Sequence, residues 1–291
     1  HLRPRRQRQM CIRDSPQAIQ VMLDPSDCGP ATIAMSQDVQ GESFDYPEVF
    51  FEEKVHEIRR VHPDPSQINQ AVEKIKNSKQ PIIISGGGVL YSEAEQELSK
   101  FAKKHNIPVT STVMGIGCMT KDDPYYISAV GALGEGSSNS LSKDTDLALA
   151  IGTKLADFTT GSWANFENPN FKLVSVNTAR YDTTKHLATP VISDAKVGLQ
   201  KISEALGDWK APDDWYKRAI KEKNEWDAYV EKQSGPTNQE EPSYAHAVGA
   251  VYRNSDPSDI VVTAAGGLVG EVVQVWKPKQ LNTFETEWGF S

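Results

Sequence analysis

The chain has 291 residues, of which 38% are hydrophobic and 24% are charged, and it carries a formal net charge of −8. This length predicts about two domains, and the excess of acidic side chains argues against nucleic acid as a partner. No apolar run approaches about 18 residues, the length that a membrane-spanning helix requires, so no membrane partner is predicted.

The three cysteines, Cys11, Cys28 and Cys118, have neither metal-ligand nor disulfide spacing, and the histidines are scattered. Free thiols are typical of a reducing compartment, so a cytoplasmic location is predicted.

The first fifteen residues, HLRPRRQRQMCIRDS, contain five arginines and one acidic residue. Such a start is typical of a targeting segment or a nucleic-acid-binding arm, although it lacks the apolar region of a secretory signal. We favour a third interpretation, in which residues 1–15 are foreign or disordered and precede a chain that begins inside a domain.

Residues 16–40 have the pattern of the end of a domain. The string QAIQVMLDP predicts a helix, and residues 31–35 predict a buried strand. One strand and part of a helix cannot bury a core, so either they join the sheet that follows or the rest of their domain is missing. Residues 41–66 have the composition of a linker, with a short helical turn predicted in FFEEKVHEI.

The stretch QPIIISGGGVLYSEAEQELSKFAKKHNIPVTST, residues 80–112, predicts one βαβ unit. Its apolar run at 82–84 does not alternate, which is typical of a strand buried on both faces of a parallel sheet. Ser92 and Glu95 have the spacing of a capping box, Asn106 is predicted to end the helix, and residues 107–110 begin a second strand.

The glycines Gly86, Gly87 and Gly88 suggest two roles. A glycine turn before a helix offers free amides to a phosphate, but SGGGVLYS lacks both the G-x-G-x-x-G spacing and the P-loop pattern. We favour a tight turn and keep ligand contact as the alternative.

Further strands are predicted at 147–151, 173–176 and 190–192, and a helix at 194–206. At least five strands alternating with helices predict an α/β fold with a doubly wound parallel sheet over residues 67–208. The loops after these strands are the expected place for a ligand crevice. They carry Gly152, Thr153, Asn177 and Asp194.

Residues 209–241 predict a charged linker helix. Its Trp215, Ala219 and Trp226 form either a docking stripe or, as we favour, a contact with the domain's own core. A helix at 244–252, a buried strand at 260–263 and the glycine turn AAGGLVGE then predict the start of another α/β unit, so that parts of two further α/β domains flank the central one and both ends are truncated.

Several strings occur in a characteristic order: GPATIAMSQDVQ, PIIISGGG, VGALG, DLALAIGTKLADFTTG, KLVSVN, DTTKH, ISDAK and IVVTAAGGLVGE. In this order the chain resembles, from Pro16 to Ser291, the thiamine-diphosphate enzymes of the acetolactate synthase group. Within that group, SQDVQGESFDYPEVFFEEKVHEI, LADFTTGSWANFENP and ETEWGFS are most similar to the ring-opening hydrolases of inositol catabolism.

The resemblance implies three domains. Residues 16–40 would end a pyrimidine-binding domain, 67–208 would form the central domain, and 242–291 would begin a diphosphate-binding domain. It also implies thiamine diphosphate and Mg²⁺ as cofactors, a small cyclic diketone as substrate, hydrolysis of a C–C bond, and a homodimer or homotetramer. The alternatives are another lyase or carboligase of the group, or a free-standing NAD- or flavin-binding module.

The resemblance places few site residues in this chain. The glutamate that activates the cofactor would precede Pro16 and the metal ligands would follow Ser291, so no catalytic or metal-ligating residue is predicted. Glu271 and Glu285 lack the metal-ligand spacing of the group. Cofactor contacts are predicted at Gly266, Gly267 and Leu268, with a purely structural turn as the alternative.

Departures from the flavin-binding members of the group argue against FAD as a cofactor. Flavin-binding relatives have a loop resembling RFDDR where this chain has Lys154 and Phe158 in GTKLADF. Asn177 also stands where an acidic residue often binds a ribose. These departures favour a central domain that is purely structural and binds no flavin.

Overall fold

The computed structural model describes residues 10–41, 43 and 45–287. The chain divides into two units, His1–Val61 and His62–Ser291. None of the helices in the described ranges is both long enough and apolar enough to cross a membrane.

The first unit contains short helices joined by irregular segments. The helix predicted in QAIQVMLDP is confirmed, but the strand predicted at 31–35 is wrong, because residues 24–36 form no strand and Ile33 and Met35 are exposed. A strand there would have no ladder partner, since the described part of this unit contains no other strand. The helices of this unit are η1 (Met10–Asp14), α2 (Ser15–Leu23), α3 (Gln37–Gln40) and η2 (Glu48–Phe50).

The predicted foreign or disordered segment falls partly on residues 1–9, which lie outside the described residues. The rest of it forms η1 and the first residue of α2.

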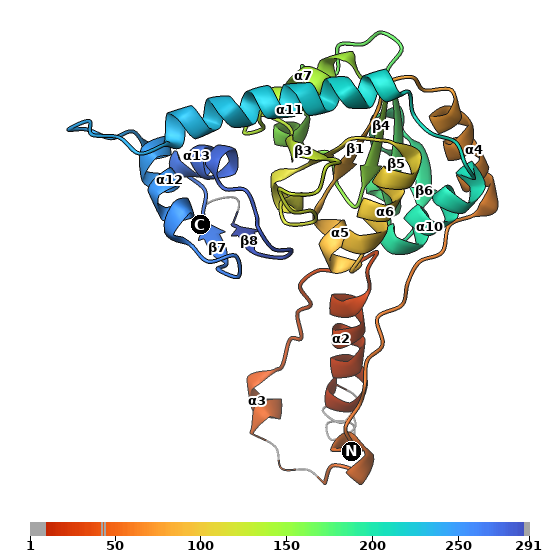
Figure 1. Cartoon of the computed structure of the whole chain (residues 1–291). Helices are drawn as coiled ribbons and strands as arrows, with labels where there is room; N and C mark the ends of the chain where they lie inside the picture. The colour runs from red at the N-terminus through yellow and green to blue at the C-terminus, as the bar shows by residue number, and fades with distance from the viewer. Residues whose placement is uncertain (1–9, 42, 44, 288–291) are drawn as a thin grey trace. The chain divides into compact units, whose positions relative to one another are not determined.

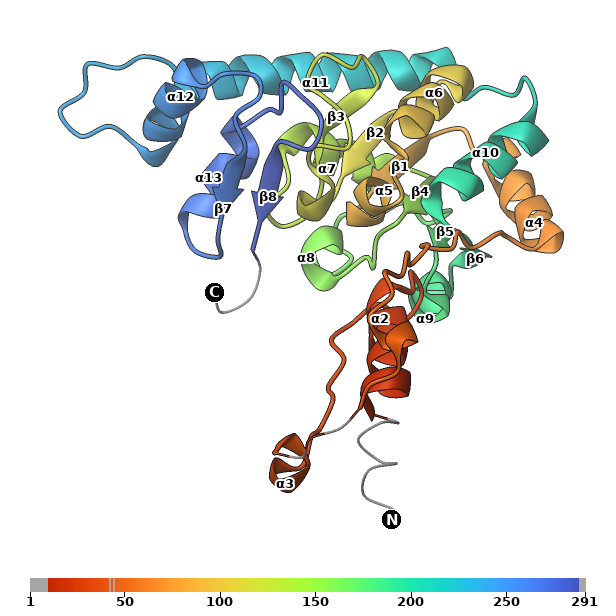
Figure 2. The same ribbon diagram turned by 90° about the horizontal axis from the view of Figure 1, so that it is seen from below.

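The second unit is built on a six-stranded parallel sheet in the order β3-β2-β1-β4-β5-β6 (Figure 1). This order confirms the predicted doubly wound α/β fold and puts the reversal of strand order between β1 and β4. The strands are β1 (Pro81–Ser85), β2 (Val109–Ser111), β3 (Tyr126–Ala129), β4 (Leu147–Ile151), β5 (Lys172–Asn177) and β6 (Thr189–Ile192). Two more strands, β7 (Val261–Thr263) and β8 (Phe284–Thr286), form a separate parallel pair (Figure 2).

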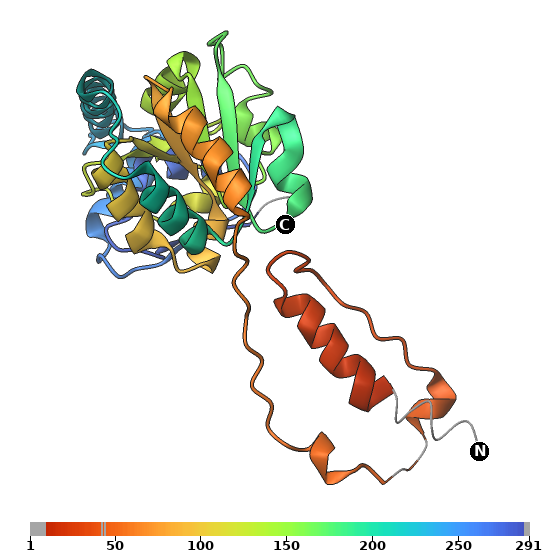
Figure 3. The same cartoon turned by 90° about the vertical axis from the view of Figure 1, so that its right-hand side faces the viewer.

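Helices cover both faces of the large sheet. On one face α4 and α10 lie side by side (Figure 3), with α6 against α10, and the opposite face is covered by α7 and α11. The helices of this unit are α4 (Pro65–Lys76), α5 (Gly87–Tyr91), α6 (Glu95–His105), η3 (Val113–Gly115), α7 (Gly136–Asp144), α8 (Asp157–Thr160), α9 (Arg180–Thr184), η4 (Lys185–Leu187), α10 (Ala195–Leu206), α11 (Asp213–Ser234), α12 (Tyr244–Asn254) and α13 (Leu268–Val275).

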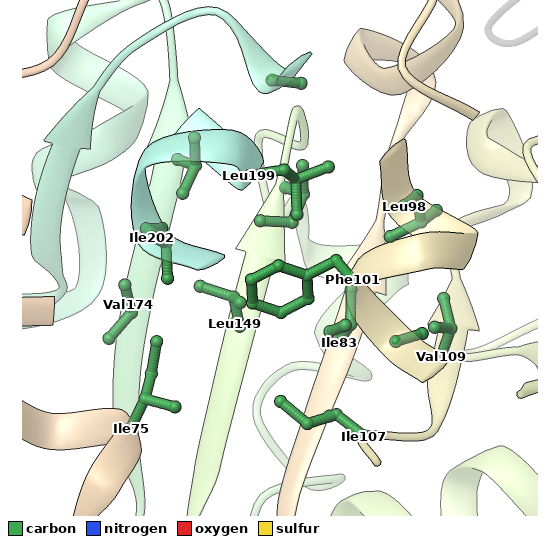
Figure 4. Packing of buried hydrophobic residues seen from close by; sticks show 14 of the residues in the cluster. Ile75, Ile83, Leu98, Phe101, Ile107, Val109, Leu149, Val174, Leu199 and Ile202 are labelled. Carbon is green, nitrogen blue, oxygen red and sulfur yellow. The ribbon is translucent and has the colours of Figure 1, made fainter. Parts of the chain in front are cut away.

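The apolar run of β1 is explained by its two buried faces. Ile83 joins the cluster under α6 and α10, where Phe101 lies beside Leu149 (Figure 4), whereas Ile82 and Ile84 join the cluster under α7 and α11. Successive side chains of a strand point to opposite faces, so a strand covered on both sides needs apolar residues at every position.

The loops after β1 and β4 meet through glycines. The amide of Gly86 donates to the carbonyl of Ile151 at 2.8 Å, and that of Gly88 donates to the carbonyl of Gly152 at 2.9 Å. A Cβ atom at Gly86 would lie 2.4 Å from the Gly152 oxygen. This close backbone approach confirms the tight-turn role of the first glycine cluster.

The predicted capping box is wrong. Ser92 follows the end of α5, and α6 begins at Glu95 with Ala94 as its N-cap residue. The hydroxyl oxygen of Ser92 instead accepts a hydrogen bond from the amide of Ala195 at 3.4 Å. The predicted end of α6 at Asn106 is confirmed, since this residue has the left-handed conformation of a C-cap.

Helix α11 packs on its own unit, as favoured over a docking stripe. Trp215 and Ala219 are buried against the sheet, and the Trp215 indole donates to the carbonyl of Pro81 at 2.8 Å. The other end of α11 contacts α12 and α13 (Figure 1). There Val230 joins a third cluster with Val272 and Phe284.

The strand predicted at 260–263 is confirmed as β7, but its predicted burial is wrong. Ile260 and Val262 are 63% and 73% exposed. In the described residues β7 pairs only with β8, so one edge of this strand has no neighbouring strand there.

We expect Gly86→Ala to destabilise the second unit by about 1–3 kcal/mol or more, because the added methyl overlaps backbone that cannot move freely. Gly270→Ala is the control, since its Cβ atom would lie 3.7 Å from Leu133 and alanine favours a helix by up to about 1 kcal/mol. Urea unfolding measures both variants. Equal stability of the two would show that the contact between the glycine loops is not tight.

His105 is a buried histidine with both ring nitrogens satisfied. Its Nδ1 donates to the carbonyl of Trp209 at 2.8 Å, and its Nε2 lies 2.9 Å from the Ser203 hydroxyl, which is therefore the donor. Burial lowers the pKa of His105, and the charges of Lys104 and Lys210 lower it further. The neutral imidazole thus ties α6 to α10 and to the loop that follows it.

A lowered pKa in the folded state means that the stability from His105 is complete above its unfolded pKa of about 6.5 and is lost as the pH falls below it. We expect His105→Phe to cost about 1–3 kcal/mol at pH 7 and less at pH 5, measured by urea unfolding at both values. The exposed His62 provides the control His62→Gln. A cost for His105→Phe that is the same at both pH values would contradict this assignment.

Candidate functional site

At the first glycine turn, two of the three glycine amides are bonded within the protein. The amides of Gly86 and Gly88 are bonded to the β4 strand and its loop, as described above, and the amide of Gly152 donates to Val176 at 2.8 Å. The helix after this turn, α5, has five residues. The contact of a ligand with this turn, kept as an alternative from the sequence, therefore gains no support.

The second glycine turn, at Gly266 and Gly267, is open and its glycine amides are unbonded within the described residues. Gly266 and Gly267 join β7 to α13 and are exposed, and a Cβ atom at either would meet nothing within 4 Å. Within the described ranges, no residue accepts a hydrogen bond from either amide. Gly266 has φ = +149°, a conformation that favours glycine. Open space and unbonded amides are what an anion requires.

Two electrostatic effects at this turn act in opposite directions on an anion. Helix α13 has eight residues and begins at Leu268, so the positive end of its dipole lies at the turn. Glu271 lies in its first turn. A divalent cation would offset the repulsion between that carboxylate and a bound anion.

The prediction that this chain contributes no metal ligand is not tested by the structure. Glu285 lies on β8 opposite Val262 of β7. The described part of the chain contains no group of three or more His, Cys, Asp or Glu side chains able to hold a metal ion.

The polar residues of the predicted ligand crevice serve the local structure. The Thr153 hydroxyl oxygen accepts from the amide of Leu155 at 3.1 Å. The Asn177 side chain donates to the carbonyl of Thr153 at 3.2 Å and accepts from the amide of Ala179 at 3.0 Å. Asp194 caps α10 by accepting from the amide of Val197 at 3.1 Å. These bonds give each side chain a structural role, and its contact with a ligand stays a prediction.

The loop after β4 bears on the predicted absence of FAD. Phe158 is 63% exposed and Lys154 is exposed as well. Neither supplies the planar, multiply donating guanidinium that the flavin-binding relatives have here. The absence of FAD stays a prediction.

A set of polar residues at the other end of α13 was missed from the sequence. Glu135, which precedes α7, forms an ion pair with Lys277, which follows α13, and both side chains are largely buried. Burial raises the pKa of Glu135 to about 7, against the opposing charge of Lys277. The string GEGSS gave no sign of this burial, because a glutamate between glycines is usually exposed.

Three named relatives match the chain over most of its length. It is 37% identical over 298 aligned positions to a 3D-(3,5/4)-trihydroxycyclohexane-1,2-dione hydrolase from Clostridium tetani. It is 34% identical to the proteins of that name from Geobacillus thermodenitrificans and Clostridium botulinum. Each match covers 94% of this chain and 46% of the relative, so the chain spans about half the length of these proteins.

Part of the chain also matches a known protein family. Residues 68–202 match the family described as thiamine pyrophosphate enzyme, central domain. These residues run from α4 to α10 and include all six strands of the large sheet. The part of the chain from residue 68 to residue 202 is therefore similar to the central domain of thiamine pyrophosphate enzymes.

Proposed function

We propose that this chain is part of a thiamine-diphosphate-dependent hydrolase that opens the ring of a trihydroxycyclohexane-1,2-dione. The family of the central domain supports the cofactor, and the names of the relatives support the substrate and the reaction. The observation that carries the proposal is the turn at Gly266, Gly267 and Leu268, whose two glycine amides are unbonded within the described chain and face open space.

In this proposal the glycine turn holds the diphosphate. The amides of Gly266 and Gly267 would donate to its oxygens, and the N-terminus of α13 would add the positive end of its dipole. Glu271 would lie near the diphosphate, where a bound Mg²⁺ would supply the balancing positive charge. When bound, thiamine diphosphate supplies a carbanion for attack on a carbonyl group. The residues of this chain bind and orient, and the catalytic glutamate and the metal ligands lie elsewhere in the enzyme.

The domain boundaries and the assembly belong to the same proposal. Residues 16–40 end a pyrimidine-binding domain, and residues 242–291 begin the diphosphate-binding domain. The two kinds of cofactor domain meet across a subunit interface, so the enzyme is a homodimer or a homotetramer. Its location is cytoplasmic.

A free-standing nucleotide-binding module is the second candidate. The strand order of the large sheet is the one found in dinucleotide-binding domains, which favours it. Against it, the amides of Gly86, Gly88 and Gly152, where the strand order reverses, are bonded within the protein. The phosphate-binding capacity therefore lies in the second glycine turn.

We expect Gly267→Val to weaken binding of thiamine diphosphate by at least tenfold in the enzyme that contains this chain. The added side chain enters open space, so the thermal unfolding midpoint without cofactor should stay unchanged. Calorimetric titration with thiamine diphosphate and Mg²⁺ measures the affinity, and Gly270→Ala is the matched control in α13. Unchanged affinity in Gly267→Val would contradict the assignment of the turn.

We also expect the 291-residue chain by itself to be inactive towards a cyclic 1,2-diketone. The metal ligands and the activating glutamate act together, and the loss of one such element costs orders of magnitude in rate. Loss of the diketone absorbance, with saturating thiamine diphosphate and Mg²⁺, measures turnover. Ring opening by this chain would show that it contains a catalytic set that the proposal lacks.

A further inference from the structure

The C-terminal end of α13 is attached to the central sheet by polar contacts. The Gln274 amide nitrogen donates to the carbonyls of Leu133 and Gly134 at 3.0 and 2.9 Å. One residue further along the loop, Glu135 pairs with Lys277. Both contacts reach the same segment, residues 133–135, which leads from β3 to α7.

The pair of Glu135 and Lys277 is enclosed. The Glu135 side chain is 2% exposed and that of Lys277 is 16% exposed. The other charged groups that act on the Glu135 carboxyl are Lys223 and Asp227 of α11. Tyr126 of β3 is a further titratable group that interacts electrostatically with Glu135. Removing one partner of a buried pair leaves the other without compensation, so such a pair strongly resists separation.

Apolar packing makes α13 and the central sheet one body around these contacts. Val269, Val272 and Val273 of α13 join a cluster that includes Ile116 and Ala129 from the central part of the unit. A helix of eight residues is about 12 Å long. Fixing its C-terminal end therefore also fixes the position of the glycine turn at its N-terminal end.

We propose that the segment Leu133–Glu135 positions the cofactor turn, with Glu135 acting through Lys277 and the two carbonyls acting through Gln274. Glu135 and Gln274 are then positioning residues, because they act on the Gly266–Leu268 turn through α13. This inference rests on the proposed function, in which that turn binds the diphosphate.

A glutamine at position 135 separates the contact from the charge. Its side-chain oxygen can still accept a hydrogen bond from Lys277, whereas an alanine removes both the acceptor and the charge.

Hydrogen exchange on the 291-residue chain tests the positioning without any cofactor. We expect Glu135→Ala and Gln274→Met each to raise the exchange of amides 271–275, the hydrogen-bonded part of α13, by at least tenfold and to leave α4 and α10 unchanged. Glu135→Gln, which keeps an acceptor oxygen for Lys277, should stay within a few-fold of the wild type.

The matched control is Glu167→Gln. Glu167 forms an ion pair with Lys143 in which both side chains are more than half exposed, so its removal should leave the exchange of amides 271–275 unchanged. Unchanged exchange in both Glu135→Ala and Gln274→Met would overturn the proposal. So would exchange in Glu135→Gln as fast as that in Glu135→Ala.

A second measurement separates this inference from the proposed function. In the enzyme that contains this chain, Glu135→Ala should weaken thiamine diphosphate binding by several-fold, and Glu135→Gln should restore it. If exchange responds as expected but neither Gly267→Val nor Glu135→Ala changes the affinity, the positioning of α13 stands and the cofactor role of the turn fails. If Gly267→Val alone lowers the affinity, the cofactor role stands and the positioning role fails.

Discussion

The rest of the second unit depends on the burial of both faces of its parallel sheet. Because Ile82 and Ile84 face one layer of helices and Ile83 faces the other, neither layer can be omitted without exposing β1 to water. The long helix α11 follows from this constraint. Its Trp215 end completes one layer over the sheet, while its Val230 end supports the cluster around α13.

The two glycine turns show how similar strings acquire different roles. In the first turn the neighbouring loop comes so close that glycine is needed for packing, and the amides of Gly86 and Gly88 are bonded to β4 and its loop. In the second turn a Cβ atom at either glycine would meet nothing within 4 Å, and no described residue accepts a hydrogen bond from either glycine amide. The difference lies in what the fold places beside each turn, and a glycine string carries no information about its neighbours.

Much of the fold could be predicted from local patterns, and the exceptions share a physical cause. The run LALAI predicted β4 with its correct ends, because a strand buried on both faces has only apolar side chains. Strand β3 and helix α7 were missed because their contact is polar. The Ser128 hydroxyl lies 3.1 Å from that of Ser137, so buried serines replace the apolar pattern. The ion pair of Glu135 with Lys277 was missed because its two residues are far apart in the sequence. The cofactor contacts at Gly266–Leu268 were predicted from family resemblance and stay a prediction.

Strand β7 has a consequence for how this chain behaves in solution. In the described residues it pairs on one side only, and it exposes Ile260 and Val262. An edge strand with apolar side chains and open backbone groups is a template on which other chains can add strands. The acidic net charge of the chain opposes such association. Self-association through β7 should therefore increase with salt, which screens that repulsion.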